Sequence, residues 1–108
     1  MTPPQPLGEF EHVVLLAVLH LGNDAGTGLL REFLEEHTKR SIARGALYTT
    51  LDRLEQKGLV RSHMGDASRT RGGRPRRYYR VSTTGVRAMK EARATLLALW
   101  HGLDSQLA

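Results

Sequence analysis

Residues 43–85 constrain the fold more than any other part of the chain, because three kinds of segment follow one another there in a fixed order. An amphipathic segment with helical spacing, ARGALYTTLDRLEQKG, leads directly into LVRSH, which has the alternation of a half-buried strand. A loop rich in glycine and arginine, GDASRTRGGRPR, separates that strand from a second one, RYYRV. We therefore expect a helix followed by a basic β-hairpin. Such an arrangement suits a helix that enters the major groove of DNA and a hairpin that lies on the flanking backbone.

The spacing of apolar residues predicts further helices around this segment. We expect helices over residues 8–21, 27–38, 44–57 and 83–103 or beyond, and strands over residues 59–63 and 76–81. Thr27 and Ser82 are expected to cap the second and the last helix, and Gly58 is expected to follow the end of the third. The predicted fold class is mainly α with a small β-hairpin, a winged helix-turn-helix followed by a long C-terminal dimerisation helix. A generic basic α+β domain is the alternative, since fold alone does not give function.

The chain divides into three expected parts. Residues 1–7, which contain three prolines, form a flexible N-terminal arm. Residues 8–82 form a winged-helix DNA-binding domain, and residues 83–108 form the C-terminal dimerisation helix.

Charge and cysteine content narrow the classes of function. The 108 residues include 16 Lys or Arg and 11 Asp or Glu, so the net charge is +5, which is compatible with a polyanionic partner. The absence of cysteine excludes disulfides and cysteine-ligated zinc. No apolar run approaches the roughly 20 residues of a membrane span, and the N-terminal residues lack the pattern of a signal peptide. We therefore expect a cytoplasmic protein without membrane contact.

Short motifs occur in a fixed order along most of the chain: Leu7-Gly8-x-Phe10-Glu11, Leu47-Tyr48, Leu51, Leu54-Glu55, Lys57-Gly58-Leu59-Val60, a Gly-Gly-Arg loop, Tyr78-Tyr79 and Ser82-x-x-Gly85. In order and spacing these motifs resemble the PadR-like family of winged-helix transcriptional regulators, over about residues 7–100. The resemblance implies a homodimer formed through the C-terminal helix together with the first helix. The chain departs from the family pattern at Ala43-Arg44, where a Ser often followed by Pro is usual, and at Thr27-Gly28, where Tyr-Gly is usual.

The outward face of the helix at 44–57 carries the predicted base-reading residues. With Leu47, Leu51 and Leu54 turned inward, the helical step points five residues outward: Gly45, Thr49, Asp52, Arg53 and Gln56. DNA would repel Asp52 unless its carboxylate accepts from a cytosine amino group, and pairing with a nearby arginine is the favoured alternative. Thr49 can contact a base edge, Arg53 can reach a phosphate, and Gly45 permits close approach to the groove. Tyr48 lies at the boundary, where a half-buried core position and a DNA contact are equally compatible with its spacing. The alternative for the whole face is a solvated polar surface. The predicted DNA-binding residues of this helix are Arg44, Gly45, Tyr48, Thr49 and Arg53.

The loop between the strands is the predicted wing. Residues 69–80 contain six arginines and no acidic residue, and such a cluster repels itself unless an anion neutralises it. A guanidinium is always charged and binds phosphate through two hydrogen bonds. We predict DNA contacts from Arg71, Arg74, Arg76 and Arg77, with a flexible solvated loop as the alternative.

The last helix carries a heptad pattern with a single polar member: Val86, Met89, Arg93, Leu96, Trp100, Leu103 and Leu107. A helix of this length exceeds the core of so small a domain, so half of the pattern should be exposed in a monomer. We predict a dimer interface that includes Val86, Met89, Leu96, Trp100 and Leu103, with packing wholly inside one subunit as the alternative. In some PadR-like proteins the interface encloses a small planar apolar effector. Trp100 would contact such an effector here, unless it is only a packing anchor.

No pattern of catalytic residues or metal ligands is visible, so we expect neither an enzyme nor a cofactor. The sequence predicts a regulator, most consistent with a repressor, that binds an inverted repeat in double-stranded DNA as a homodimer. A nonspecific or architectural nucleic-acid-binding protein and a winged-helix protein-interaction module are the rivals.

Overall fold

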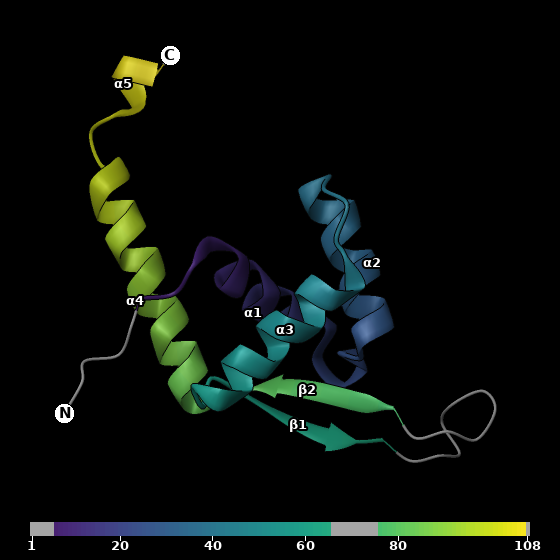
Figure 1. The fold of residues 1–108 in the computed structure, drawn as a ribbon. Coiled ribbons are helices and arrows are strands. Elements are labelled where there is room, and N and C mark those ends of the chain that lie inside the picture. Colours follow the sequence, from purple (N-terminus) through teal and green to yellow (C-terminus); the bar gives the residue numbers. More distant parts are fainter. Residues whose placement is uncertain (1–5, 66–75, 108) are drawn as a thin grey trace.

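The computed structural model describes residues 6–65 and 76–107 (Figure 1). Three helices come first, followed by an antiparallel hairpin and a long helix that extends away from the rest of the molecule. The elements are α1 (Glu9–Leu21), the short 3₁₀ helix η1 (Gly22–Asp24), α2 (Thr27–Thr38), α3 (Arg44–Gln56), β1 (Val60–Met64), β2 (Arg77–Val81), α4 (Thr83–Trp100) and α5 (Asp104–Leu107). This order confirms the predicted winged helix-turn-helix with a long C-terminal helix. No helix within the described residues is long and apolar enough to cross a membrane.

Capping groups set the ends of the first three helices. Gly8 is the N-cap of α1, and its backbone N–H donates to Glu11 Oε1 at 2.9 Å, so the helix begins one residue later than predicted. The predicted Thr27 cap is wrong, because Gly26 holds the extended N-cap conformation and Thr27 is the first helical residue. The prediction for Gly58 is confirmed. Gly58 has φ of 76°, and the amide of Leu59 bonds to a carbonyl five residues earlier, which closes α3 in a Schellman motif.

The hairpin is attached to the helices along one edge. Val60 pairs with Val81 and Met64 with Arg77. β1 is therefore shifted by one residue from the predicted 59–63, and β2 begins one residue later than the predicted 76–81. The amide of Tyr79 donates to the carbonyl of Ala25 at 3.0 Å, and Gly26 bridges to the β2 strand beside it. The loop before α2 therefore continues the sheet beyond β2, and this fixes the base of the hairpin against the helical domain.

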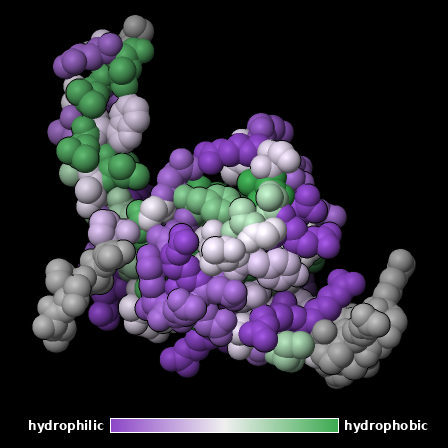
Figure 2. All heavy atoms as spheres, in the orientation of Figure 1, coloured by the Kyte–Doolittle hydropathy of each residue, from purple (hydrophilic) through white to green (hydrophobic). Residues whose placement is uncertain are grey.

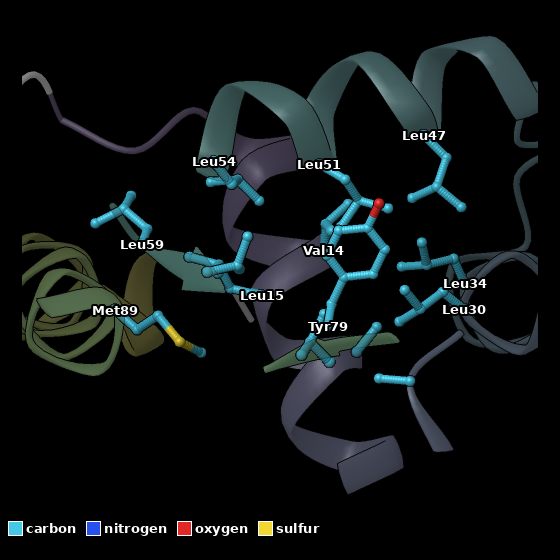
Figure 3. Packing of buried hydrophobic residues seen from close by; sticks show 14 of the residues in the cluster. Val14, Leu15, Leu30, Leu34, Leu47, Leu51, Leu54, Leu59, Tyr79 and Met89 are labelled. Atoms are coloured by element: carbon cyan, nitrogen blue, oxygen red, sulfur yellow. The ribbon is translucent and has the colours of Figure 1, made fainter. Parts of the chain in front are cut away.

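One apolar core joins α1, α2, α3 and the hairpin (Figure 3). Leu47, Leu51 and Leu54 of α3 are buried, as predicted. Leu51 and Leu54 lie over Val14 and Leu15 of α1, and Leu47 lies over Leu34 of α2 (Figure 3). The remaining buried apolar residues are Ala17, Val18, Ala25, Leu30, Leu34, Ile42, Leu59, Val60, Tyr79 and Met89. Because the inward face of α3 is filled in this way, its opposite face is left to solvent.

The C-terminal helix behaves differently from the prediction. Ser82 caps α4 as expected, and its side chain accepts a hydrogen bond from the amide of Gly85. The helix ends at Trp100, however, and Gly102 has φ of 81°, so the predicted continuation to Leu103 or beyond is wrong. Leu103 lies in the connection that follows and Leu107 in the separate helix α5. Every residue of α4 from Arg93 to Trp100 is exposed, and this end of the helix stands clear of the helical domain (Figure 1).

The predicted N-terminal arm falls mostly outside the described residues, which begin at Pro6. Leu7 is half-buried and packs against the core, so the last residue of the predicted arm belongs to the folded domain.

Candidate nucleic-acid interface

The outward face of α3 consists of the residues predicted from its helical spacing. Gly45, Thr49 and Arg53 are exposed, and a Cβ added at Gly45 would meet nothing within 4 Å. Arg44 is exposed in the first turn, where Ala43 caps the helix without a side-chain hydrogen bond. Asp52 and Gln56 are exposed on the same face. This face therefore offers a hydroxyl, two cations, a flat glycine position, an amide and one carboxylate to a partner.

Tyr48 connects two helices of the helix-turn-helix. Its side chain is 44% exposed, and its hydroxyl lies 3.3 Å from Thr27 Oγ1 at the start of α2. Tyr48 is therefore a boundary residue, as its spacing indicated. The threonine at position 27, where the family pattern usually has tyrosine, provides the hydroxyl that lies next to Tyr48.

The hairpin carries exposed arginines besides the ones predicted to bind DNA. Arg76 and Arg77 are exposed, whereas Arg71 and Arg74 lie outside the described residues. Arg61 and Arg80 face each other across the hairpin, and both are exposed. Like charges placed directly opposite destabilise a strand pair, so this pair is suited to an anionic partner. The alternation of residues along β1 indicated that Arg61 is exposed, but only the pairing register shows that it lies opposite Arg80.

The arginine at the start of β2 lies on the inner face of the hairpin, beside α3. Arg77 Nη1 donates to Ser62 Oγ at 2.9 Å, and Ser62 Oγ donates to Glu55 Oε2 at 2.7 Å. Tyr79 shares this face, and burial raises the pKa of its hydroxyl, with the charge of Arg77 opposing the rise and that of Asp52 adding to it. Charged and polar groups of α3 and β2 therefore form one connected surface.

A partly buried ion pair joins two of the sequence motifs. Glu11 Oε2 of α1 accepts from Lys57 Nζ, which follows α3, at 2.8 Å. Burial acts to raise the pKa of Glu11, but the hydrogen bonds from Lys57 and Gly8 and the charges of Lys57 and Arg53 lower it below its ordinary value. This pair fixes α1 against the end of α3, and no sequence pattern had indicated it.

Two further motifs meet where α4 begins. Ser82 Oγ donates to the carbonyl of Gly58 at 2.7 Å, and the Ser82 amide donates to the carbonyl of Leu59 at 3.0 Å. A Cβ added at Gly85 would lie 2.1 Å from that same Leu59 carbonyl oxygen and 2.8 Å from Val81 Cγ1. Only glycine permits this approach, and it sets the direction in which α4 leaves the domain.

The residues predicted for a dimer interface have different environments. Leu96 and Trp100 are 53% and 54% exposed on the second half of α4, and Leu103 is 36% exposed beyond its end. Val86 is half-buried, whereas Met89 is only 6% exposed and belongs to the core of this subunit, so the selection of Met89 is not supported. Apolar side chains gather on this part of the molecule (Figure 2). An open groove between α1 and α4 is lined by apolar residues that include Val13, Leu16, Ala88, Ala92 and Leu96, and Trp100 is not among them.

Both the sequence and the fold are similar to those of known transcriptional regulators. Residues 15–91 match the model of the transcriptional regulator PadR-like family. The chain is 37% identical over 91 residues to the transcriptional regulator Rv3488 of Mycobacterium tuberculosis, covering 82% of this chain and 80% of that protein. A PadR family transcriptional regulator from Eggerthella lenta is similar in structure, with a TM-score of 0.68 and 29% identity over 92% of this chain and 86% of that one. A transcriptional regulator from Clostridium thermocellum shares the fold, with a TM-score of 0.68 and 20% identity over 88% of this chain and 89% of that one. The chain therefore belongs to the PadR-like family of transcriptional regulators.

Proposed function

We propose that the chain represses transcription by binding an inverted-repeat operator as a homodimer, with α3 in the major groove and the basic hairpin on the flanking backbone. The exposed face of α3 is the observation that carries this proposal. It presents Thr49 and Arg53, and the hairpin arginine Arg77 is linked to the same helix through Ser62 and Glu55. This arrangement lies within a fold typical of DNA-binding regulators. A cytoplasmic location is part of this proposal, because that is where a transcriptional regulator meets its DNA.

The contacts within α3 divide into two kinds that an experiment can separate. Thr49 lies mid-helix and is placed for a base edge, so Thr49→Ala should reduce affinity for operator more than for scrambled DNA. Arg53 is placed for a phosphate, so Arg53→Ala should weaken both to a similar extent. Operators would first be selected from a random duplex library with the wild-type chain, and competition binding would then compare the variants. Equal losses on both DNAs for Thr49→Ala would contradict a base contact.

The rival function is nonspecific or architectural binding. A dimer on an inverted repeat needs both half-sites, separated by about 34 Å or a multiple of it. Scrambling one half-site should therefore reduce affinity strongly for a specific dimer and hardly at all for an architectural binder. A selection that returns no repeated sequence would favour the rival.

The exposed apolar half of α4 supports the dimer part of the proposal. Leu96→Glu would place a charge in an apolar contact from each subunit, which is strongly unfavourable, and should yield a monomer. Ala94→Glu is the matched control, because Ala94 is exposed on the opposite side of the same helix. Sedimentation equilibrium at tens of micromolar measures the state of each. A monomeric wild type would remove the dimer and the inverted repeat together.

A small planar apolar effector is a further part of the proposal, and it rests on the family resemblance and on the exposure of Trp100. Such a ligand should quench the fluorescence of this sole tryptophan and change operator affinity. A ligand panel that alters neither quantity would contradict it.

A further inference from the structure

Arg77 is held by its neighbours in a way that suggests a role beyond its charge. The pairing of Met64 with Arg77 and of Ser62 with Tyr79 places Arg77 on the hairpin face that carries buried Tyr79. That face is turned toward the helices, so Arg77, although exposed, extends from the side of the hairpin that faces α3.

The hydrogen bonds fix the direction of a three-residue chain. Ser62 has a single hydroxyl proton, and it is donated to Glu55 Oε2 at 2.7 Å. The lone pairs of Ser62 Oγ then face Arg77, whose Nη1 donates to that oxygen at 2.9 Å. Each of these bonds has a charged partner, which makes it stronger than a bond between neutral groups. The chain connects α3 through β1 to β2. Within residues 6–65 and 76–107 the Arg77 side chain makes this one hydrogen bond, which leaves other N–H groups of the exposed guanidinium for a ligand.

We propose that Ser62 and Glu55 are positioning residues that hold the Arg77 guanidinium beside α3, ready for a phosphate at the edge of the groove that α3 enters. This inference rests on the proposed DNA-binding function. A long side chain that must be ordered on binding weakens the complex, so an arginine held in advance binds more tightly. The same chain sets the distance between the major-groove contacts and the wing contacts.

A double-mutant cycle separates positioning from folding. The probe is a fluorescein-labelled duplex selected from a random library with the wild-type chain, and the variants are Ser62→Ala, Arg77→Ala and the double variant in the full chain. Ser62→Ala should weaken binding about three- to tenfold when Arg77 is present, the cost of ordering one long side chain. In the Arg77→Ala background the same change should have no effect on affinity. Ser62→Thr keeps the hydroxyl and should retain wild-type affinity.

The salt dependence of binding separates loss of the phosphate contact from loss of its positioning. Arg77→Ala removes a phosphate contact and should reduce the slope of log affinity against log salt by about 0.9. Ser62→Ala leaves the contact in place, so its affinity should fall while its slope stays that of the wild type.

Each outcome supports or overturns the inference. Equal losses from Ser62→Ala in both backgrounds would mean that the change acts on the fold, and an unchanged affinity would mean that Arg77 needs no positioning; both overturn the inference and leave the proposed function intact. A wild-type chain that binds no duplex overturns the proposed function and the inference together.

Discussion

Gly85 is the position where a single methyl group should do the most damage. A Cβ there would lie 2.1 Å from the carbonyl oxygen of Leu59, a backbone atom that cannot rotate away, and 2.8 Å from Val81 Cγ1. The start of α4 must therefore move away from β1 in Gly85→Ala. That movement strains the two hydrogen bonds made by Ser82 to Gly58 and Leu59.

The expected cost of Gly85→Ala combines three effects. Overpacking costs about 1–3 kcal/mol, and each strained hydrogen bond costs about 1 kcal/mol. The better helix propensity of alanine recovers about 1 kcal/mol. We expect a net loss of about 2–4 kcal/mol in the free energy of unfolding, which for a domain of this size lowers Tm by roughly 10–30 °C.

Urea unfolding at one fixed protein concentration measures this loss, since a dimer would make stability depend on concentration. Gly28→Ala is the matched control, because Gly28 lies in the first turn of α2 and a Cβ there meets nothing within 4 Å. The control should be neutral or stabilised by up to about 1 kcal/mol. A loss below about 1 kcal/mol for Gly85→Ala, or equal losses for both variants, would refute the reasoning from the close contact.

Three other perturbations test the remaining packing and charge interactions. Glu11→Gln should cost about 1–2 kcal/mol at pH 7, because the amide can accept from Gly8 but not pair with the charge of Lys57. Folding lowers the pKa of Glu11, so its contribution to the free energy of unfolding is complete above the unfolded pKa of about 4 and is lost as the pH falls through the folded pKa. The unfolding curves of variant and wild type should therefore converge in acid. A difference that persists there would contradict the ion pair. Leu51→Ala, at a side chain with no exposure, should cost about 2–5 kcal/mol by chemical denaturation, and a loss below about 1 kcal/mol would be inconsistent with the core. Tyr48→Phe removes an exposed hydroxyl contact and should shift the unfolding free energy by less than about 0.5 kcal/mol, so a loss of more than about 1 kcal/mol would show a stronger contact than the distance implies.

Local patterns predicted the elements around α3 correctly because short-range forces decide them. The stripe of Leu47, Leu51 and Leu54 set the inward face of α3, and Gly58 ended the helix through its left-handed conformation. Ser82 marked the start of α4 in the same way. The leucine stripe also defined which residues of α3 face outward, so the position of its part of the candidate interface followed from the sequence.

Other features needed the fold because their partners are distant along the chain. The pairing of Glu11 with Lys57 joins residues 46 positions apart, and neither residue signals the other. Gly26, and not Thr27, is the N-cap of α2, and its backbone also bridges to β2. The hydroxyl of Thr27 lies close to that of Tyr48 instead.

The sequence by itself determined the order of the elements, the inward stripe of α3 and the basic character of the hairpin, because each depends on spacing and residue type within a few turns or strands. Only the tertiary structure decided that Met89 lies in the core, that α4 stops at Trp100, and that Arg77 is bound to Ser62 beside α3. The physical reason is that burial and side-chain hydrogen bonds depend on what another element places opposite a residue. Helical or strand periodicity sets which way a side chain points and leaves open what it meets there.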